Sequence, residues 1–320
     1  MSEPSGPALC VVSGAWRQRS SERAFVVRAL AGAATRRGPV TVLTSGPART
    51  SEPDGAFDVI GLGVDLEDGW VPPQGTDLAA VIPDGAAMLI DAGPDFAAAL
   101  GALPGSHRLF ALDRGVGSAT VLGVVPEPED GRLLVGLHVP VNPLAAVHRH
   151  NGFGQVGYVL VLSDGSGEAG VPPDAAAWIT AGFYDADVVV VERAVASLWR
   201  GRALRGETSV DSRTDLWRLI SHARVCVDTA PGPLLARECV EAMRFGTPVI
   251  VPATAPAAAS HARAAGGLTY AGTAELLDAV ARCRDDDVRS ELSARGREYA
   301  DALYGDPAAF CTRLREALDS

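Results

Sequence analysis

The chain has 320 residues, of which 47% are hydrophobic and 21% charged, and its formal net charge is −11. A chain of this length is too long for a single typical domain and fits two domains of roughly 150 residues each. No apolar run reaches the roughly 18 residues needed to cross a membrane. The acidic balance argues against a nucleic-acid partner, so any phosphate site must be local.

The first half opens as a parallel α/β unit. Residues 8–13 form an apolar run that Gly14 ends, and the periodicity over 22–37 predicts a helix. A strand predicted at 40–44 completes a β-loop-α-β unit, the start of a doubly wound sheet. Further predicted elements are strands at 57–61, 87–91, 108–112, 120–125 and 133–139 and a helix at 95–103.

The second half restarts the same pattern. Strand and helix periodicity both fail over 140–157, a stretch rich in Pro, Gly and Asn, which suggests a hinge near residue 150. We therefore expect an N-terminal, acceptor-side domain at 1–150 and a C-terminal, donor domain at 151–320. The elements predicted after the hinge are strands at 158–162, 188–191, 225–228 and 248–251, and helices at 174–183, 212–223, 234–245, 273–284, 288–304 and 307–318.

The alternation of strands and helices sets the expected fold class. Alternating elements of this length indicate parallel sheets covered on both faces. The expectation is an α/β fold of two Rossmann-like domains facing a cleft, with C-terminal helices able to cross back to the N-terminal domain.

Cysteine and histidine spacing gives no sign of a metal or a disulfide framework. The cysteines are scattered without C-x-x-C spacing, which is typical of buried thiols in a reducing compartment. His148 and His150 are close in sequence but have no carboxylate or thiol at ligand spacing. Residues 1–7 carry no signal-peptide pattern, so a cytoplasmic location is expected. Contact with a membrane surface and the oligomeric state stay open.

The pattern G-x-G-x-x-G occurs twice, and neither copy fits a dinucleotide site. The copy at 152–157 precedes a predicted strand instead of following one. The copy at 165–170 follows a strand, but Pro172 and Pro173 delay the helix past the glycines, so no helix N-terminus would point at a pyrophosphate. The sequence therefore predicts no cofactor.

The segment 228–252, DTAPGPLLARECVEAMRFGTPVIVP, is the most informative. A predicted strand ends at Asp228, a tight turn follows, and the next helix begins at the carboxyl edge of the sheet, where backbone N–H groups can hold an anion or a sugar. On this helix Glu238 and Glu241 share one face, while Cys239 and Met243 lie on an opposing apolar face. Both carboxylates are expected to look the same way.

Here the chain resembles the retaining GT-B glycosyltransferases of family 4, also called group 1. Their C-terminal domain carries a glutamate, a second glutamate eight positions later, and then A-M-x-x-G-T-P-V. The stretch 241–250, EAMRFGTPVI, matches the second half of that motif, and the likeness extends over roughly 212–305. The loop at Gly14 is similar but less specific.

The resemblance implies a nucleotide-sugar site without a metal. Glu241 would hold the ribose hydroxyls of the donor, and the backbone of Gly232, Pro233 and Leu234 would face its sugar or phosphate, with Gly14 on the N-terminal side. The chain departs from the family in two places: Pro233 stands where the first glutamate is expected, with Glu238 as the nearby substitute, and Ser163 and Asp164 stand where basic residues usually meet the pyrophosphate. The candidates for those missing charges are Arg193, Arg200 and Arg202.

Three functions remain open at this level. The first is a retaining, metal-independent glycosyltransferase that uses a nucleoside diphosphate-sugar and an unknown acceptor, with Arg193 or Glu238 as catalytic candidates. The second is a non-catalytic GT-B relative that binds a ligand or partner, and the third is a nucleotide-sugar epimerase. The plainer interpretation of Glu238 and Glu241 is a solvated helix face in which Arg237 pairs with Glu241. The arginines at 193–205 could likewise be ordinary surface residues.

Overall fold

The structure is a computed structural model, and it divides into two compact units. Unit 1 comprises Met1–Leu137 and Pro307–Ser320, and unit 2 comprises His138–Asp306. Residues 138–150 thus group with the second unit and the last helix with the first, whereas the sequence pattern predicted a single division near residue 150. The structure describes residues 8–17, 22–45, 51–54, 57–62, 78–91, 107–112, 119–125, 132–146, 157–163, 175–183, 188–193, 199–203, 206–210, 212–229 and 235–320.

In its described part, unit 1 is built on an eight-stranded sheet with the order β3-β4-β2-β1-β5-β6-β7-β8. Only β3 runs antiparallel to its neighbour, β4; the other pairs are parallel. The strands are β1 (Leu9–Ser13), β2 (Val40–Thr44), β3 (Ser51–Asp54), β4 (Phe57–Gly61), β5 (Ala87–Asp91), β6 (Arg108–Leu112), β7 (Thr120–Gly123) and β8 (Leu133–Leu134). The helices are η1 (Gly14–Arg17), α1 (Glu22–Ala34), η2 (Leu78–Ala80) and α9 (Pro307–Asp319).

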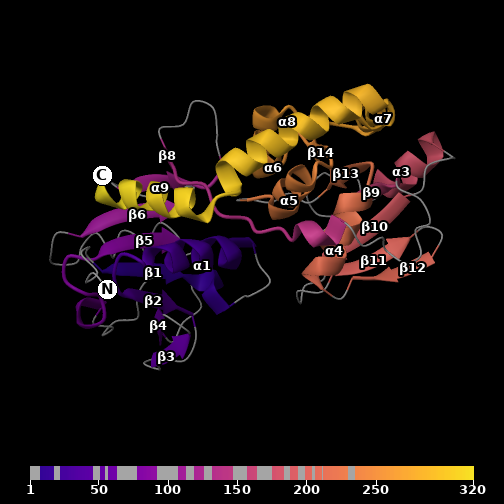
Figure 1. Cartoon of the computed structure of the whole chain (residues 1–320). Helices are drawn as coiled ribbons and strands as arrows, with labels where there is room; N and C mark the ends of the chain where they lie inside the picture. The colour runs from indigo at the N-terminus through magenta and orange to yellow at the C-terminus, as the bar shows by residue number, and fades with distance from the viewer. Residues whose placement is uncertain are drawn as a thin grey trace. The chain divides into compact units, whose positions relative to one another are not determined.

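The central strands of unit 1 are buried on both faces. All five residues of β1 are buried, as are all five of β5, which is typical of a parallel sheet covered on both sides. Helix α9 packs on α1, and Arg37 pairs with Asp319 at 2.5 Å. In Figure 1 the yellow helix α9 accordingly lies among the indigo and purple elements of unit 1.

In its described part, unit 2 contains a seven-stranded sheet with the order β12-β11-β10-β9-β13-β14-β15. Its strands are β9 (Val159–Ser163), β10 (Val188–Arg193), β11 (Trp199–Ala203), β12 (Gly206–Ser209), β13 (Val225–Asp228), β14 (Val249–Pro252) and β15 (Leu268–Tyr270). Its helices are η3 (Pro143–Ala146), α3 (Ala175–Gly182), α4 (Arg213–His222), α5 (Arg237–Phe245), α6 (Pro256–Ala265), α7 (Thr273–Arg284) and α8 (Asp286–Tyr304).

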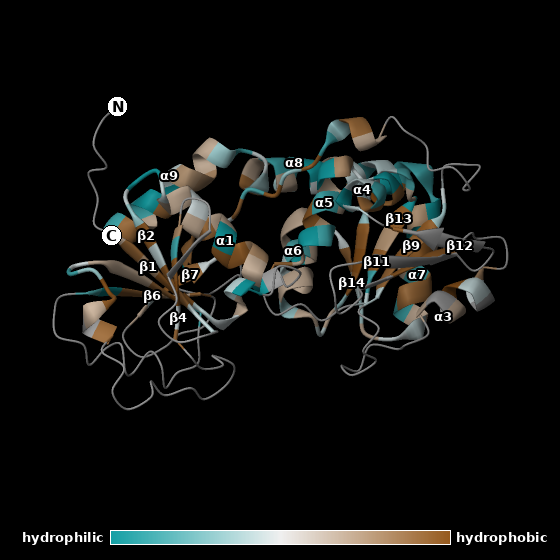
Figure 2. Cartoon of the chain, turned by 90° about the horizontal axis from the view of Figure 1, so that it is seen from below, coloured by the Kyte–Doolittle hydropathy of each residue, from teal (hydrophilic) through white to brown (hydrophobic). Residues whose placement is uncertain are grey.

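The sheet of unit 2 is parallel from β10 to β15, and β11 and β12 add an antiparallel hairpin at one edge. The central strands β9, β13 and β14 are mostly apolar and buried, and they appear largely brown in Figure 2. Side-chain caps begin two helices: the Ser212 hydroxyl accepts from the Asp215 N–H of α4, and Asp285 accepts from Asp287 and Val288 of α8.

Most predicted elements are found where the sequence placed them. The strands at 40–44, 57–61, 87–91, 108–112 and 225–228 and the helix at 273–284 have the predicted bounds. The hairpin β11-β12, helix α6 and strand β15 were not predicted, and the helix predicted at 95–103 lies outside the described residues. None of the helices that the structure describes is both long enough and apolar enough to span a bilayer.

Candidate functional site

Helices α4 and α5 both begin at the carboxyl edge of the unit 2 sheet. Helix α5 is the next element after β13. Helix α4 is joined to the start of β13 by only two residues, so α4 runs antiparallel to this strand and begins at the same edge. Because backbone N–H groups are unpaired in the first turn of a helix, this edge carries partial positive charge from two helix starts. It is the edge at which open α/β sheets bind their ligands.

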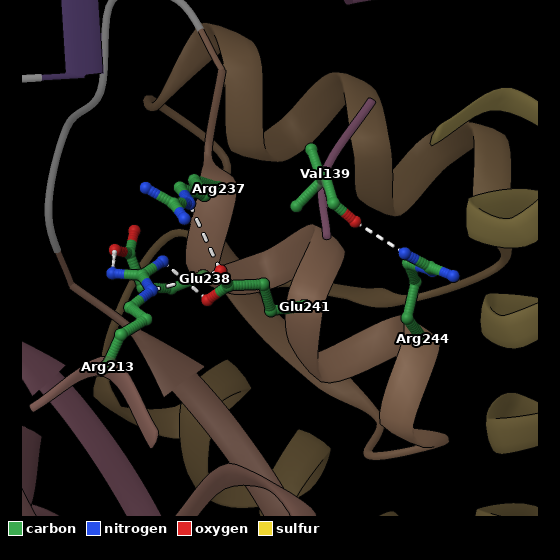
Figure 3. Close-up of polar contacts among 6 residues, drawn as sticks. All are labelled: Val139, Arg213, Arg237, Glu238, Glu241 and Arg244. Atoms are coloured by element: carbon green, nitrogen blue, oxygen red, sulfur yellow. Dashed lines mark hydrogen bonds and ion pairs between the residues drawn. The ribbon is translucent and has the colours of Figure 1, made fainter. Parts of the chain in front are cut away.

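Arg213, the first residue of α4, joins the two helix starts. Its Nε donates to Oε1 of Glu241 at 3.0 Å and its Nη2 to Oε2 of the same carboxylate at 2.5 Å, a bidentate pair. Its Nη1 donates to Oε1 of Glu238 at 2.8 Å. Figure 3 shows the guanidinium directed at both carboxylates of α5.

Arg237 closes the cluster from the first turn of α5. Its Nε donates to Oε1 of Glu241 at 3.1 Å, the i to i+4 pair expected from the sequence. Glu241 is fully buried and Glu238 is 4% exposed, so the interpretation as a solvated face is wrong. The side chains of Arg213 and Arg237 remain 25% and 23% exposed, so the two arginines form the outer layer of the cluster and the two acids the inner one. We call these four residues the arginine–glutamate cluster.

The acids hold the guanidinium of Arg213 charged. Burial alone would lower its pKa, but attraction to Glu241 and Glu238 and their hydrogen bonds outweigh it, so the pKa of Arg213 is raised above its ordinary value. Burial lowers the pKa of Arg237, an effect that Glu241 partly offsets. The charges of the two arginines and the two glutamates cancel, and the N-termini of α4 and α5 add partial positive charge.

The end of β13 at this edge is polar as well. Asp228, the last residue of β13, is buried and accepts a hydrogen bond from the Cys239 thiol at 3.3 Å. The Thr229 hydroxyl donates to the carbonyl of Leu162 in β9 at 2.8 Å, which ties the start of the following loop to the neighbouring strand. Among the described residues no group of three or more His, Cys, Asp and Glu side chains is arranged to hold a metal ion.

The other residues singled out from the sequence are not brought to this cluster by the described part of the chain. Arg193 ends β10 and is aligned with Trp199 of the hairpin, and only its backbone position is described. Arg200 and Arg202 lie on β11 of the same hairpin. Gly14 belongs to unit 1, where it is the first residue of η1. Gly232, Pro233 and Leu234 lie outside the described residues.

Sequence reasoning missed Arg213. A signal was present, since a basic residue in the first turn of a helix opposes the helix dipole and needs a compensating partner. The Ser212 cap fixes where α4 begins and thereby puts Arg213 in that first turn. The partners, however, are 25 and 28 positions away in sequence, so their identity needed the tertiary structure.

Comparison with known proteins yields likeness of structure only. No protein-family model matches the chain, and no curated protein does. Sucrose-phosphate synthase from Thermosynechococcus elongatus has a TM-score of 0.65 at 14% identity, covering 98% of each chain. A mutant of the O-GlcNAc transferase from Thermobaculum terrenum has a TM-score of 0.63 at 17% identity, covering 98% of this chain and 67% of that one.

A third structural neighbour is also named for the synthesis of a sugar phosphate. The α,α-trehalose 6-phosphate synthase from Burkholderia multivorans has a TM-score of 0.60 at 13% identity, covering 98% of this chain and 99% of that one. Similarity at these identities establishes the fold, since one fold serves many functions. The chain has the GT-B glycosyltransferase fold, with two Rossmann-like units built on largely parallel sheets.

Proposed function

We propose that the protein is a glycosyltransferase that takes its sugar from a nucleoside diphosphate-sugar and passes it to an acceptor hydroxyl. The fold and the family 4 resemblance around Glu241 support this function. From that resemblance we also infer retention of configuration and independence of a metal ion. The single observation that carries the proposal is the arginine–glutamate cluster at the starts of α4 and α5.

The cluster suits the diphosphate part of a donor. A guanidinium has five N–H donors, and the two carboxylates use three of those on Arg213. The remaining N–H groups of this part-exposed side chain are pre-oriented by Glu238 and Glu241, so binding costs little side-chain entropy. In this proposal Arg213 takes the place of the basic residues missing after β9.

Glu241 would meet the ribose, as the resemblance implies. Among the described residues, its Oε1 accepts from Arg213 and Arg237 and its Oε2 from Arg213, which leaves one acceptor position on Oε2. Because Glu241 is fully buried, a ribose hydroxyl reaches it only if Arg213 shifts outward toward the phosphates. Catalysis would then rest on positioning the donor and on stabilising the departing diphosphate by Arg213 and the helix N–H groups.

The first test measures nucleotide binding as the change in melting temperature that UDP, GDP or ADP causes. A ligand at 100 times its dissociation constant adds about 2.7 kcal/mol of stability, so one of the three should raise the melting temperature. The Arg213→Gln variant should lose most of that rise, because a charged hydrogen bond to phosphate contributes about 1.5–3 kcal/mol.

The matched control is Arg218→Gln on the same helix, whose arginine forms a half-buried ion pair with Asp215 at 2.9 Å. It should keep the full nucleotide-induced shift. Equal shifts in Arg213→Gln and the unaltered protein would contradict the assignment of the diphosphate to Arg213.

One observation favours a second candidate, a non-catalytic relative that binds a ligand or partner. Both oxygens of Glu241 are engaged by arginines within the protein itself, and Pro233 stands where the family has its first glutamate. Incubation with radiolabelled UDP-, GDP- and ADP-sugars separates the candidates. Donor consumption that Arg213→Gln abolishes supports the enzyme, binding without consumption supports the relative, and conversion of the donor sugar without an acceptor indicates an epimerase.

A further inference from the structure

A second set of polar side chains lies in unit 1, at the ends of its three central strands. Ser13 is the last residue of β1, Thr44 of β2 and Asp91 of β5. In the sheet register Ser13 is aligned with Thr44 on one side and with Asp91 on the other. Aligned residues of neighbouring strands point to the same face, so the three side chains form a row at the carboxyl edge.

The row is buried and partly connected. Ser13 and Thr44 are fully buried and Asp91 is 5% exposed. The Ser13 hydroxyl donates to Oδ2 of Asp91 at 2.7 Å and accepts from the Ala15 N–H at 3.2 Å. Arg23, in the first turn of α1, donates from Nε and Nη2 to Oδ1 of Asp91 at 3.0 and 2.7 Å. The Arg23 side chain is 44% exposed, so it covers the row from the solvent side.

Thr44 stands apart from this network. Its Oγ1 is buried and has no hydrogen-bond partner among the described residues. An unpaired buried hydroxyl destabilises a protein by about 1–3 kcal/mol, and native structures contain few of them. Packing alone would be served as well by valine at this position, so the Thr44 hydroxyl is available for a hydrogen bond to a ligand.

The place of the row in the sheet is also informative. From β1 the chain passes to β2 on one side of the sheet, and later enters β5 on the other side. The order of strands therefore reverses between β1 and β5, and open α/β sheets bind ligands beyond the carboxyl ends of the strands at this reversal. Ser13 and Asp91 end the two strands that flank it.

We propose that Ser13, Thr44, Asp91 and Arg23 form a binding site for a neutral, hydroxyl-rich ligand, a sugar or another polyol. The charges of Arg23 and Asp91 cancel, which favours a neutral ligand. A phosphate would be repelled by the carboxylate of Asp91, and an amine would be repelled by the guanidinium of Arg23. Thr44 both donates and accepts, Asp91 accepts and Arg23 donates. Vicinal hydroxyl groups, each of which donates and accepts, match this mixture, and they approach Asp91 past the part-exposed Arg23.

The site lies in unit 1 and shares no residue with the arginine–glutamate cluster of unit 2. Its use as the acceptor site rests on the proposed glycosyltransferase activity, whereas the ligand class does not. In a transferase it would define the acceptor as a sugar or polyol whose hydroxyl is the group glycosylated.

The test is saturation-transfer NMR on the full chain with methyl α-D-glucopyranoside, methyl α-D-mannopyranoside and myo-inositol as separate probes. At least one should receive saturation. Thr44→Val should raise the dissociation constant of that probe by about 3- to 10-fold, the effect of one neutral hydrogen bond, and Arg23→Gln by about 10-fold or more. Without ligand, Thr44→Val should melt no lower than the unaltered protein, because it removes an unpaired hydroxyl.

The matched control is Thr41→Val, on the same strand but the opposite face, which should leave the dissociation constant unchanged. The proposal is overturned if no probe receives saturation, or if Thr44→Val and Thr41→Val bind the probe equally well. It is also overturned if inorganic phosphate, and not a polyol, raises the melting temperature in a way that depends on Arg23. If no nucleotide shifts the melting temperature of the unaltered protein, that result would contradict the donor proposal alone. Polyol binding that persists in Arg213→Gln would show that the two sites are independent.

Discussion

At the scale of single residues, burial decides what the acids of α5 do. The sequence places Glu238 and Glu241 on one face, and the structure confirms that both meet the same guanidinium. Carboxylates almost never lie fully buried without a cation, and Arg213 and Arg237 are the partners that make it possible here. The acids are therefore the inner support of an outer pair of arginines.

His261 shows the opposite case, a titratable group held neutral. It is fully buried on α6, its Nδ1 lies 3.0 Å from the Tyr299 hydroxyl, and its ring meets those of Tyr299 and Tyr304 edge to face. Its Nε2 is buried without a hydrogen-bond partner in the described part of the chain. Burial lowers the pKa of His261 to about 3, because the charged imidazolium would lose its contact with water.

This histidine should make stability fall as the solution becomes more acidic. Between its ordinary pKa of about 6.5 and the folded value of about 3, the unfolded chain binds a proton that the folded chain does not. The free energy of unfolding should therefore drop by about 1.4 kcal/mol per pH unit through this window because of His261. Above pH 6.5 His261 is neutral in both the folded and the unfolded chain, so it causes no loss of stability there.

Urea unfolding of the unaltered protein and of His261→Phe at several pH values checks this. The phenylalanine keeps an aromatic ring between the two tyrosines and cannot titrate. Carboxylates titrate in both proteins, so the difference between the two curves isolates His261. Parallel curves would show that folding leaves the pKa of His261 unchanged.

At the scale of elements, α5 is shaped by what ends it. Gly246 follows its last residue with φ 78°, a left-handed conformation, and its N–H bonds to the carbonyls of Ala242 and Met243. This turn returns the chain into β14, whose residues are all buried. A glycine is favoured here because a side chain raises the energy of this conformation.

Two glycine-to-alanine changes should therefore act in opposite directions. Gly246→Ala should lower the free energy of unfolding by about 1–2 kcal/mol, the strain of a left-handed residue, and its Cβ would also press on Arg297. Gly32→Ala, inside α1 where a Cβ meets no atom within 4 Å, should raise it by about 0.5–1 kcal/mol. Urea titrations measure both, and a destabilised Gly32→Ala would refute the open space assigned to it.

At the scale of the whole molecule, the last helix of the chain belongs to the same unit as the first strand. Helix α9 buries Phe310 and Leu314 and packs on α1, and Arg313 donates to the carbonyl of Val135 at 2.8 Å. The last helix thus belongs to the unit that the first strand begins, as the fold expected from the sequence allowed. Removing its core contacts should loosen unit 1.

Hydrogen exchange on the full chain can test this assignment. Phe310→Ala should cost about 3–5 kcal/mol, as large-to-small changes in a core do, and should speed amide exchange in α1 and β1 while leaving β9 and β13 protected. Leu276→Ala, in the core of unit 2, should do the reverse. Uniform acceleration across both units in either variant would show that they unfold together.

The sequence by itself determined the local elements and the fold class. Strands such as β1 and β5 are continuous apolar runs, and α4 begins at a serine cap, because these signals are carried by neighbouring residues. The hairpin β11-β12 escaped prediction because its strands, WRGRA and GETS, lack an apolar pattern. Alanine-rich α6 escaped as well.

Only the tertiary structure decided which polar residues meet. Arg213 reaches Glu238 and Glu241 because α4 and α5 start at one sheet edge, and Ser13 reaches Asp91 because β1 and β5 pair in register although 78 positions separate them. Contacts of this kind depend on sheet order and register, which are set by packing over the whole unit. No spacing along the chain encodes them.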